Sequence, residues 1–196
     1  MIAQEQLKYT VEDYFALDEE AVKEGNRYEY HDGDIFLISD SSVKHSRILS
    51  KVHGHLFGLL NGKPCEAVIS SMKVHVQTSS FYCYPDITVV CGDFKNLDDH
   101  DDIIINPTVI IEILSPSTMD YDRGEKFRLY RQIPSLKEYI CISSVQVSIE
   151  KYTRKSNFEW LLQDYYSLQD AIVFESLDIE LSITDIYENI DLTPTA

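Results

Sequence analysis

Three charged residues interrupt apolar patterns in this sequence, at positions where a charge needs a partner, a metal ion or a function. Glu112 stands inside the apolar run 109–114, a pattern typical of a strand buried on both faces. Asp86 opens a second, β-branched run, 87–91. Lys126 lies in segment 123–133, whose apolar residues recur at helical spacing, and at about 100° per residue it falls within the apolar stripe. These three residues are therefore candidates for one site.

Two carboxylates and a lysine are groups that a site for a hard divalent cation can use. Neighbouring strands lie about 4.8 Å apart, so Asp86 and Glu112 could share one Mg²⁺, which prefers oxygen ligands and keeps several waters. The helix begins soon after the strand that carries Glu112, so a crossover can return Lys126 over the carboxyl end of that strand, where α/β sheets commonly bind ligands. A cation would activate water there, and Lys126 would orient that water or neutralise developing charge.

Each residue also has an alternative that involves no chemistry. Asp86 could face solvent at the entry of its strand, and Lys126 could extend its amine outward over its aliphatic stem. Glu112 and Lys126 could also form a buried ion pair that serves only the fold. The residues by themselves leave these alternatives open.

The remaining patterns indicate a single α/β domain over residues 1–196. A long amphipathic helix is predicted over 43–60, and Asp32-Gly33 predicts a hairpin between two short strands. A second helix is predicted from Asp122, acting as its N-cap, to Pro134. Together with the next strand it forms a strand–helix–strand crossover. Further strands are predicted at 65–70, 73–77, 86–91, 109–114, 138–143, 145–153 and 158–166, and strands with a short terminal helix at 171–190.

Composition limits the class of partner. The chain has 17 basic and 33 acidic residues, a formal net charge of -16, and this field argues against non-specific affinity for nucleic acid. Four basic residues nevertheless crowd into positions 123–131, so a local positive patch can exist. No long apolar window and no signal-peptide pattern occurs. We expect a cytoplasmic protein with no membrane segment.

The four cysteines, Cys65, Cys83, Cys91 and Cys141, show no CxxC spacing and fall in predicted strands. We expect them to be buried reduced thiols rather than zinc ligands or disulfides.

Three stretches carry a resemblance to a known family: "YEYHDGD", "YPDITVV" and "PTVIIEILSPSTMDYDRGEKFRLYRQIPSLKEYICIS". They resemble the Uma2 family of the PD-(D/E)xK nuclease superfamily, from about Tyr28 to Tyr187. The resemblance implies an α/β, restriction-endonuclease-like three-layer core over about 28–187, with a mixed central β-sheet flanked by helices and extra antiparallel strands. It also implies a Mg²⁺-dependent endonuclease, with Mn²⁺ as an alternative cation and nucleic acid, DNA above all, as substrate.

The superfamily motif transfers to this sequence with one departure. Pro85-Asp86 corresponds to its PD, and Glu112 to its second acid. The superfamily lysine would fall at Leu114, where it is absent. In Uma2-like sequences the lysine lies instead on the following helix, which here is Lys126, the residue that the apolar stripe had already selected.

Weaker transfers add three supporting positions. By the same resemblance the backbone carbonyl of Ile113 is a metal ligand, Glu29 supplies a supporting carboxylate, and His45 precedes the long helix near the site. Glu29 could equally be a strand-surface residue and His45 a surface histidine.

The rival hypothesis is a catalytically inactive, nuclease-fold module that contacts protein or nucleic-acid partners. Such nucleases often pair, so a homodimer is a further expectation.

Overall fold

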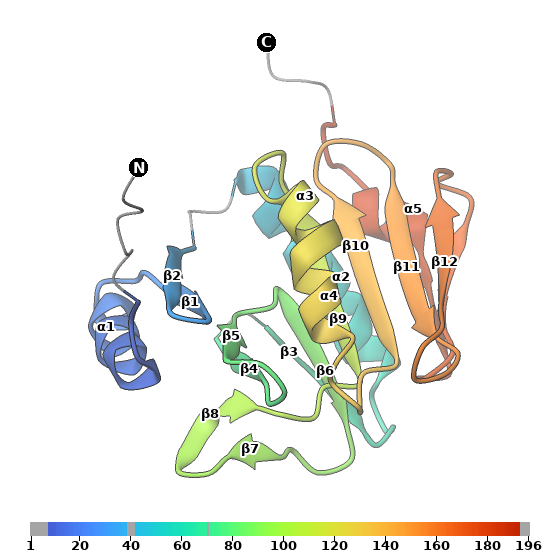
Figure 1. Cartoon of the computed structure of the whole chain (residues 1–196). Helices are drawn as coiled ribbons and strands as arrows, with labels where there is room; N and C mark the ends of the chain where they lie inside the picture. Colours follow the sequence, from blue (N-terminus) through green and yellow to red (C-terminus); the bar gives the residue numbers. More distant parts are fainter. Residues whose placement is uncertain (1–7, 39–41, 70, 193–196) are drawn as a thin grey trace, which may run out of the picture.

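The computed structural model describes residues 8–38, 42–69 and 71–192. Its helices are α1 (Val11–Lys23), α2 (Val43–Leu59), α3 (Met119–Tyr121), the π-helical turn η1 (Asp122–Lys126), α4 (Phe127–Tyr130) and α5 (Ile183–Tyr187). Its strands are β1 (Tyr28–His31), β2 (Asp34–Leu37), β3 (Cys65–Ile69), β4 (Lys73–Val76), β5 (Phe81–Cys83), β6 (Ile87–Cys91), β7 (Asn96–Leu97), β8 (His100–Ile104), β9 (Val109–Leu114), β10 (Glu138–Ser143), β11 (Ile149–Arg154), β12 (Trp160–Tyr165), β13 (Ala171–Phe174) and β14 (Ile179–Ser182). Figure 1 shows their arrangement. No helix in these described ranges is long and apolar enough to cross a membrane.

The strands of the described residues form two six-stranded sheets and one hairpin, where a mixed central sheet with extra antiparallel strands was expected. The first sheet has the order β2-β1-β5-β4-β8-β7, and the second has the order β12-β11-β10-β9-β6-β3. Both sheets are mixed, because β4 pairs with β8 and β9 pairs with β10 in parallel while their other neighbours are antiparallel. The expected mixed α/β class is confirmed. The extra strands were expected to be antiparallel, but the first sheet also contains the parallel pair β4–β8.

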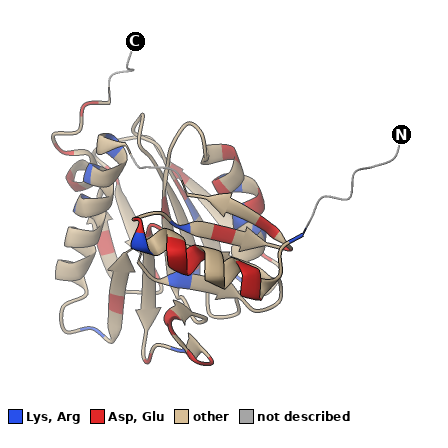
Figure 2. Ribbon diagram, turned by 90° about the vertical axis from the view of Figure 1, so that its left-hand side faces the viewer, with Lys and Arg blue, Asp and Glu red and all other residues tan. Residues whose placement is uncertain are grey.

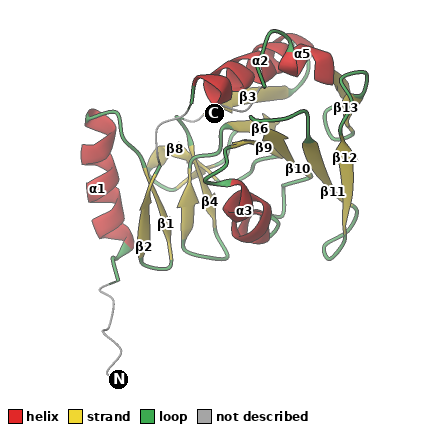
Figure 3. Cartoon of the chain, turned by 90° about the horizontal axis from the view of Figure 1, so that it is seen from above, coloured by secondary structure: helices red, strands yellow, loops and turns green. Residues whose placement is uncertain are grey.

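The second sheet is covered on both faces (Figure 3). Alternate residues of β9 separate between the faces: Ile111 and Ile113 pack in the core shared with α2 and α5, whereas Ile110 and Leu114 pack in the core shared with α4. Glu112 is two residues from both Ile110 and Leu114, so its side chain points to the same face of the sheet as theirs. It therefore faces the helical segment that carries Lys126.

Several predicted elements are confirmed at close to their predicted limits. Helix α2 covers most of the predicted helix, and β1 and β2 form the predicted hairpin, with φ of 48° at Asp32 and 90° at Gly33, as a two-residue hairpin turn of this type requires. The crossover is also present, since β10 lies parallel to β9 with Cys141 opposite Glu112.

The prediction that Asp122 caps the second helix is wrong. Helical hydrogen bonds form earlier, from Met119 N to Ser115 O at 3.0 Å and from Asp122 N to Thr118 O at 2.9 Å, so the helical segment begins at Met119. Asp122 instead opens the five-residue turn η1. Its side chain is buried, and π-helical turns of this kind are frequent at functional sites.

Helix α1 packs on the first sheet and was not predicted. Thr10 and Asp13 form a reciprocal capping box at its start, and Tyr14 packs in a core with Tyr30 and Tyr82 of the sheet. Acidic residues, coloured red, occur along this helix, which lies in front in Figure 2. One of its acidic residues, Asp18, points inward and is 1% exposed.

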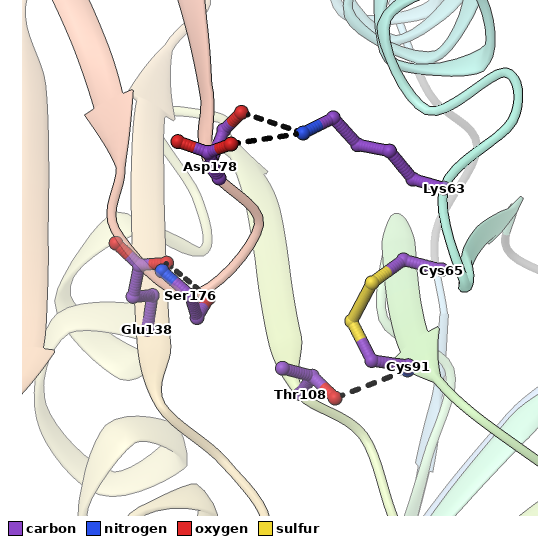
Figure 4. Close-up of a disulfide and its surroundings, with 7 residues drawn as sticks. All are labelled: Lys63, Cys65, Cys91, Thr108, Glu138, Ser176 and Asp178. Atoms are coloured by element: carbon purple, nitrogen blue, oxygen red, sulfur yellow. Dashed lines mark hydrogen bonds and ion pairs between the residues drawn. A yellow bond between two sulfur atoms is a disulfide. The ribbon is translucent and has the colours of Figure 1, made fainter.

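The expectation of four reduced cysteines is wrong for two of them. Cys65 and Cys91 are directly opposite in the antiparallel pair β3–β6 and form a disulfide (Figure 4). The register of β3 against β6 brings the two sulfur atoms within disulfide-bonding distance, although the cysteines are 26 residues apart in sequence. Cys83 and Cys141 are buried and free, as expected.

Candidate functional site

The structure brings Asp86, Glu112 and Lys126 together at one place. Ile87 pairs with Ile111 across β6 and β9, which puts the preceding Asp86 beside Glu112. The Asp86 backbone N–H donates to Glu112 Oε2 at 3.2 Å. Lys126 Nζ lies 3.0 Å from Glu112 Oε1, and the lysine side chain is only 7% exposed, so it does not extend outward into solvent.

Asp86 is held by two donors to a single oxygen. The backbone N–H of Ile113 donates to Asp86 Oδ2 at 2.8 Å, and His45 Nε2 lies 3.0 Å from the same atom. His45 lies in the first turn of α2 rather than ahead of that helix, and its side chain reaches the candidate site. Nδ1 of His45 is buried and has no hydrogen-bond partner in the described parts of the chain. The Asp86 side chain keeps 17% exposure, which leaves a route from solvent to this carboxylate.

Lys126 is surrounded by three carboxylates. Its Nζ lies 3.0 Å from Glu29 Oε1 and 3.7 Å from Asp122 Oδ1, in addition to the contact with Glu112. The predicted placement of Glu29 near the site is therefore observed. Tyr130 belongs to the same helical segment and donates its hydroxyl to Glu112 Oε1 at 2.9 Å. Glu112 is thus fixed by donors from the helix and from the strand loop that carries Asp86.

We call Glu29, Asp86, Glu112, Asp122 and Lys126 the charged cluster. Full ionisation would give it four negative charges against one positive. Burial raises the pKa of Glu112 to about 8, an effect that Lys126 opposes and the neighbouring carboxylates reinforce. Burial also raises the pKa of Asp122. Burial would lower the pKa of Lys126, but Glu112 and the other carboxylates outweigh it and raise that pKa well above its ordinary value, so the lysine stays charged.

A hard divalent cation fits the donor set and the charge of this cluster. In the described part of the chain, no donor lies within hydrogen-bond distance of Asp86 Oδ1. Glu112 Oε2 accepts one hydrogen bond, from the Asp86 N–H. A carboxylate oxygen can accept two, so both carboxylates keep acceptor capacity. Two positive charges would also offset most of the negative excess. Among residues 8–38, 42–69 and 71–192 no group of three or more His, Cys, Asp or Glu side chains is placed to hold a metal. Asp86 and Glu112 would therefore hold the ion together with water, as Mg²⁺ commonly requires.

Sequence reasoning missed three residues of the site. Asp122 was assigned to a helix cap, and Tyr130 was read as part of an apolar stripe. Tyr84 was not considered, although its N–H donates to Glu29 Oε1 at 3.2 Å. Tyr84 stands directly before Pro85-Asp86, and that adjacency is the signal that could have identified it.

Comparison with known sequences identifies the family. The family model described as "Uma2: Putative restriction endonuclease" matches residues 11–185. The Synechocystis sp. protein slr1290 is 31% identical over 185 residues, covering 93% of this chain and 93% of that protein. A second Synechocystis sp. protein, sll1609, is 29% identical over 177 residues, covering 90% of this chain and 94% of that protein. Both relatives are described as uncharacterized.

A solved structure shares the fold. It comes from Anabaena variabilis ATCC 29413 and is described as a putative nuclease belonging to DUF820. The TM-score is 0.73, and the match covers 91% of this chain and 97% of that one at 18% sequence identity. Since the family model covers most of the sequence, the chain belongs to the Uma2 family, whose description is "Putative restriction endonuclease".

Proposed function

We propose that this protein is a Mg²⁺-dependent endonuclease that hydrolyses phosphodiester bonds of nucleic acid, with DNA as substrate and Mn²⁺ as an alternative cation. The observation that supports the proposal best is the convergence of Asp86, Glu112 and Lys126 from a loop, a strand and a helix. A buried carboxylate within 3.0 Å of a buried ammonium, beside a second, partly exposed carboxylate, is an arrangement suited to a cation and a phosphate.

In this proposal Asp86 and Glu112 hold the cation, with the backbone carbonyl of Ile113 as a further ligand. When bound, the cation would lower the pKa of a coordinated water and stabilise negative charge on a phosphate oxygen. His45 and the N–H of Ile113 fix one oxygen of Asp86, which leaves the other oxygen for the ligand role. Tyr130 donates to Glu112 Oε1 and the Asp86 N–H donates to Glu112 Oε2, so Glu112 would bind the cation through the lone pairs that remain on these two oxygens.

Lys126 supplies the fixed positive charge. An ammonium has three N–H donors, and two carboxylates, Glu29 and Glu112, lie at 3.0 Å from Nζ. Asp122 is farther, at 3.7 Å, and in this proposal the third donor would serve a water or a phosphate oxygen. A cation held by the protein before the substrate arrives stabilises developing charge without reorganisation. Glu29 is the residue that keeps this ammonium in place.

The test is cleavage of a pool of duplex, single-stranded and branched DNA with Mg²⁺ or Mn²⁺, by the wild type and by Glu112→Ala. The proposal expects metal-dependent cleavage by the wild type and none by the variant. Equal activity of the two proteins, or no cleavage by either protein with any substrate and cation, would contradict it.

One observation favours the second candidate, a catalytically inactive module that retains the fold. Both oxygens of Glu112 already accept protein hydrogen bonds, so the charged cluster could serve as a structural ion pair. Isothermal titration separates the two. A Mn²⁺ site that is lost in Asp86→Ala supports the enzyme. Binding of nucleic acid or protein that is indifferent to metal, with Glu112→Gln destabilising the fold and leaving metal binding unchanged, supports the module.

A further inference from the structure

We propose that Asp18 and Tyr84 are positioning residues for the candidate site, so that helix α1 belongs to the catalytic apparatus although it contributes no residue to the charged cluster. The inference rests on the proposed function. The geometry that carries it is a series of buried contacts from α1 to Lys126, made of two hydrogen bonds of Tyr84 and one ion pair of Glu29.

Asp18 fixes the far end of the Tyr84 side chain. The Tyr84 hydroxyl donates to Asp18 Oδ2 at 2.6 Å, and Tyr28 N donates to Asp18 Oδ1 at 2.8 Å. Lys73 Nζ lies 3.2 Å from Asp18 Oδ2, so this buried carboxylate is paired.

Glu29 fixes the near end of the same residue. The backbone N–H of Tyr84 donates to Glu29 Oε1 at 3.2 Å, and that oxygen is also the one that lies 3.0 Å from Lys126 Nζ. A shift of the Tyr84 backbone therefore changes the position of a carboxylate that holds the lysine.

The hydrogen bonds that fix Tyr84 also restrict the position of Asp86. Only Pro85 separates the two residues, the proline ring fixes its own φ, and it also restricts the residue before it. Few backbone rotations remain between the fixed Tyr84 and the carboxylate of Asp86. The same tyrosine thus positions a proposed metal ligand through its backbone and the proposed catalytic lysine through Glu29.

Two cations near the aromatic ring of Tyr84 also help to hold this side chain in place. The guanidinium of Arg27 lies 5.5 Å from the centroid of the Tyr84 ring, and the ammonium of Lys73 lies 5.6 Å from it. Cations at such distances from an aromatic ring are attracted to it.

The test compares Tyr84→Phe with Tyr187→Phe. Both tyrosines are buried, at 6% and 5% exposure, and each substitution deletes one buried hydroxyl group. The Tyr187 hydroxyl lies 2.9 Å from Ser143 O and 3.3 Å from Ser148 O, away from the charged cluster. Mn²⁺ affinity is measured by titration of free Mn²⁺ by electron paramagnetic resonance, and stability by urea unfolding. A cleavage assay gives kcat and KM separately.

We expect both variants to unfold at lower urea concentration, and only Tyr84→Phe to weaken Mn²⁺ binding, by roughly 10- to 100-fold, as substitutions of groups that orient metal ligands do. Its kcat should fall while KM for DNA stays unchanged. Asp18→Asn, which keeps the shape and removes the charge, should change Mn²⁺ affinity in the same direction, and it carries the test if Tyr84→Phe does not fold.

The outcomes separate the inference from the proposed function. If the wild type binds Mn²⁺ and both Tyr84→Phe and Asp18→Asn bind it equally well, the inference is wrong and the proposed function stands. If the wild type binds no Mn²⁺ and cleaves nothing, both are wrong. If Tyr187→Phe weakens Mn²⁺ binding as much as Tyr84→Phe does, the effect is general destabilisation, and the inference is again wrong.

Discussion

The ammonium of Lys126 and the carboxylate of Glu112 meet inside the protein, with Nζ 3.0 Å from Oε1. The side chains are 7% and 5% exposed. A buried pair of this kind is weak evidence for stability, because the cost of removing two charges from water offsets much of their attraction. In the proposed function a cation completes the site and offsets the excess of carboxylates around this pair, and the following predictions separate that proposal from a purely structural role.

Lys126→Met should abolish cleavage while retaining the metal site. Loss of a preorganised positive charge lowers kcat by roughly 100- to 1,000-fold. Mn²⁺ affinity should be unchanged or higher, because the variant removes a cation that competes for Glu112. Cleavage kinetics and a Mn²⁺ titration measure the two effects. Lys126→Arg, which keeps the charge, is the matched control, and a Lys126→Met protein with wild-type kcat would exclude the lysine from catalysis.

Asp86→Asn and His45→Ala should weaken metal binding to different degrees. Asp86→Asn removes a proposed ligand and should eliminate detectable Mn²⁺ binding by calorimetry. His45→Ala leaves the ligand in place and removes the group 3.0 Å from its Oδ2, so we expect a loss of roughly 10- to 100-fold in affinity. The result that supports the account is a larger loss of Mn²⁺ affinity in Asp86→Asn than in His45→Ala. An Asp86→Asn protein that binds Mn²⁺ as tightly as the wild type would place the metal elsewhere.

The stability of the metal-free protein should fall as the pH rises toward 8. Burial raises the pKa of Glu112 from 4.5 to about 8, so between these values the folded protein holds a proton that the unfolded chain has lost. Its contribution to stability is complete below pH 4.5 and is lost as the pH rises through 8.

Urea unfolding with a chelator, between pH 6.5 and 8, measures this effect. The free energy of unfolding should decrease by up to about 1.4 kcal/mol per pH unit. Glu112→Gln cannot ionise and should lack this slope. If the wild type and Glu112→Gln show the same slope over this range, Glu112 is already ionised in the folded protein.

The Cys65–Cys91 disulfide should stabilise the fold without contributing to the site. Closing a loop with a sequence separation of 26 contributes about 3 kcal/mol in the chain-entropy account. The double variant Cys65→Ser/Cys91→Ser should therefore unfold at lower urea concentration, while its Mn²⁺ affinity stays at the wild-type value. Reductant should destabilise the wild type and leave the double variant unchanged. Thiol titration of the denatured, unreduced protein should find two free thiols, and a count of four would show that the bond is absent.

The central features of the site follow from the sequence because each depends on local pattern. Glu112 and Lys126 are charges within apolar runs, and the periodicity of a strand and of a helix is enough to point both inward. The Asp32-Gly33 hairpin is equally local. These predictions needed no knowledge of what lies opposite.

The remaining features depend on tertiary contacts that one sequence does not reveal. Asp18 is one of several acidic residues in a segment that was not predicted to be a helix, and only the packing of α1 places its side chain inside the protein. Asp122 has the residue type of a helix cap, but the π-helical turn at 122–126 moves it into the charged cluster. The Cys65–Cys91 pair requires the register of β3 against β6. The division into two sheets requires the pairing of strands far apart in the chain.

The central claim is that Asp86 and Glu112 hold a divalent cation within reach of Lys126. The most direct test is a crystal structure of the wild-type protein soaked with Mn²⁺, with anomalous diffraction to locate the metal. The account predicts an anomalous peak between the carboxylates of Asp86 and Glu112, with Lys126 Nζ no more than about one water away from the metal. An Mn²⁺ soak that leaves this position without a peak, with the charged cluster unchanged, would contradict it.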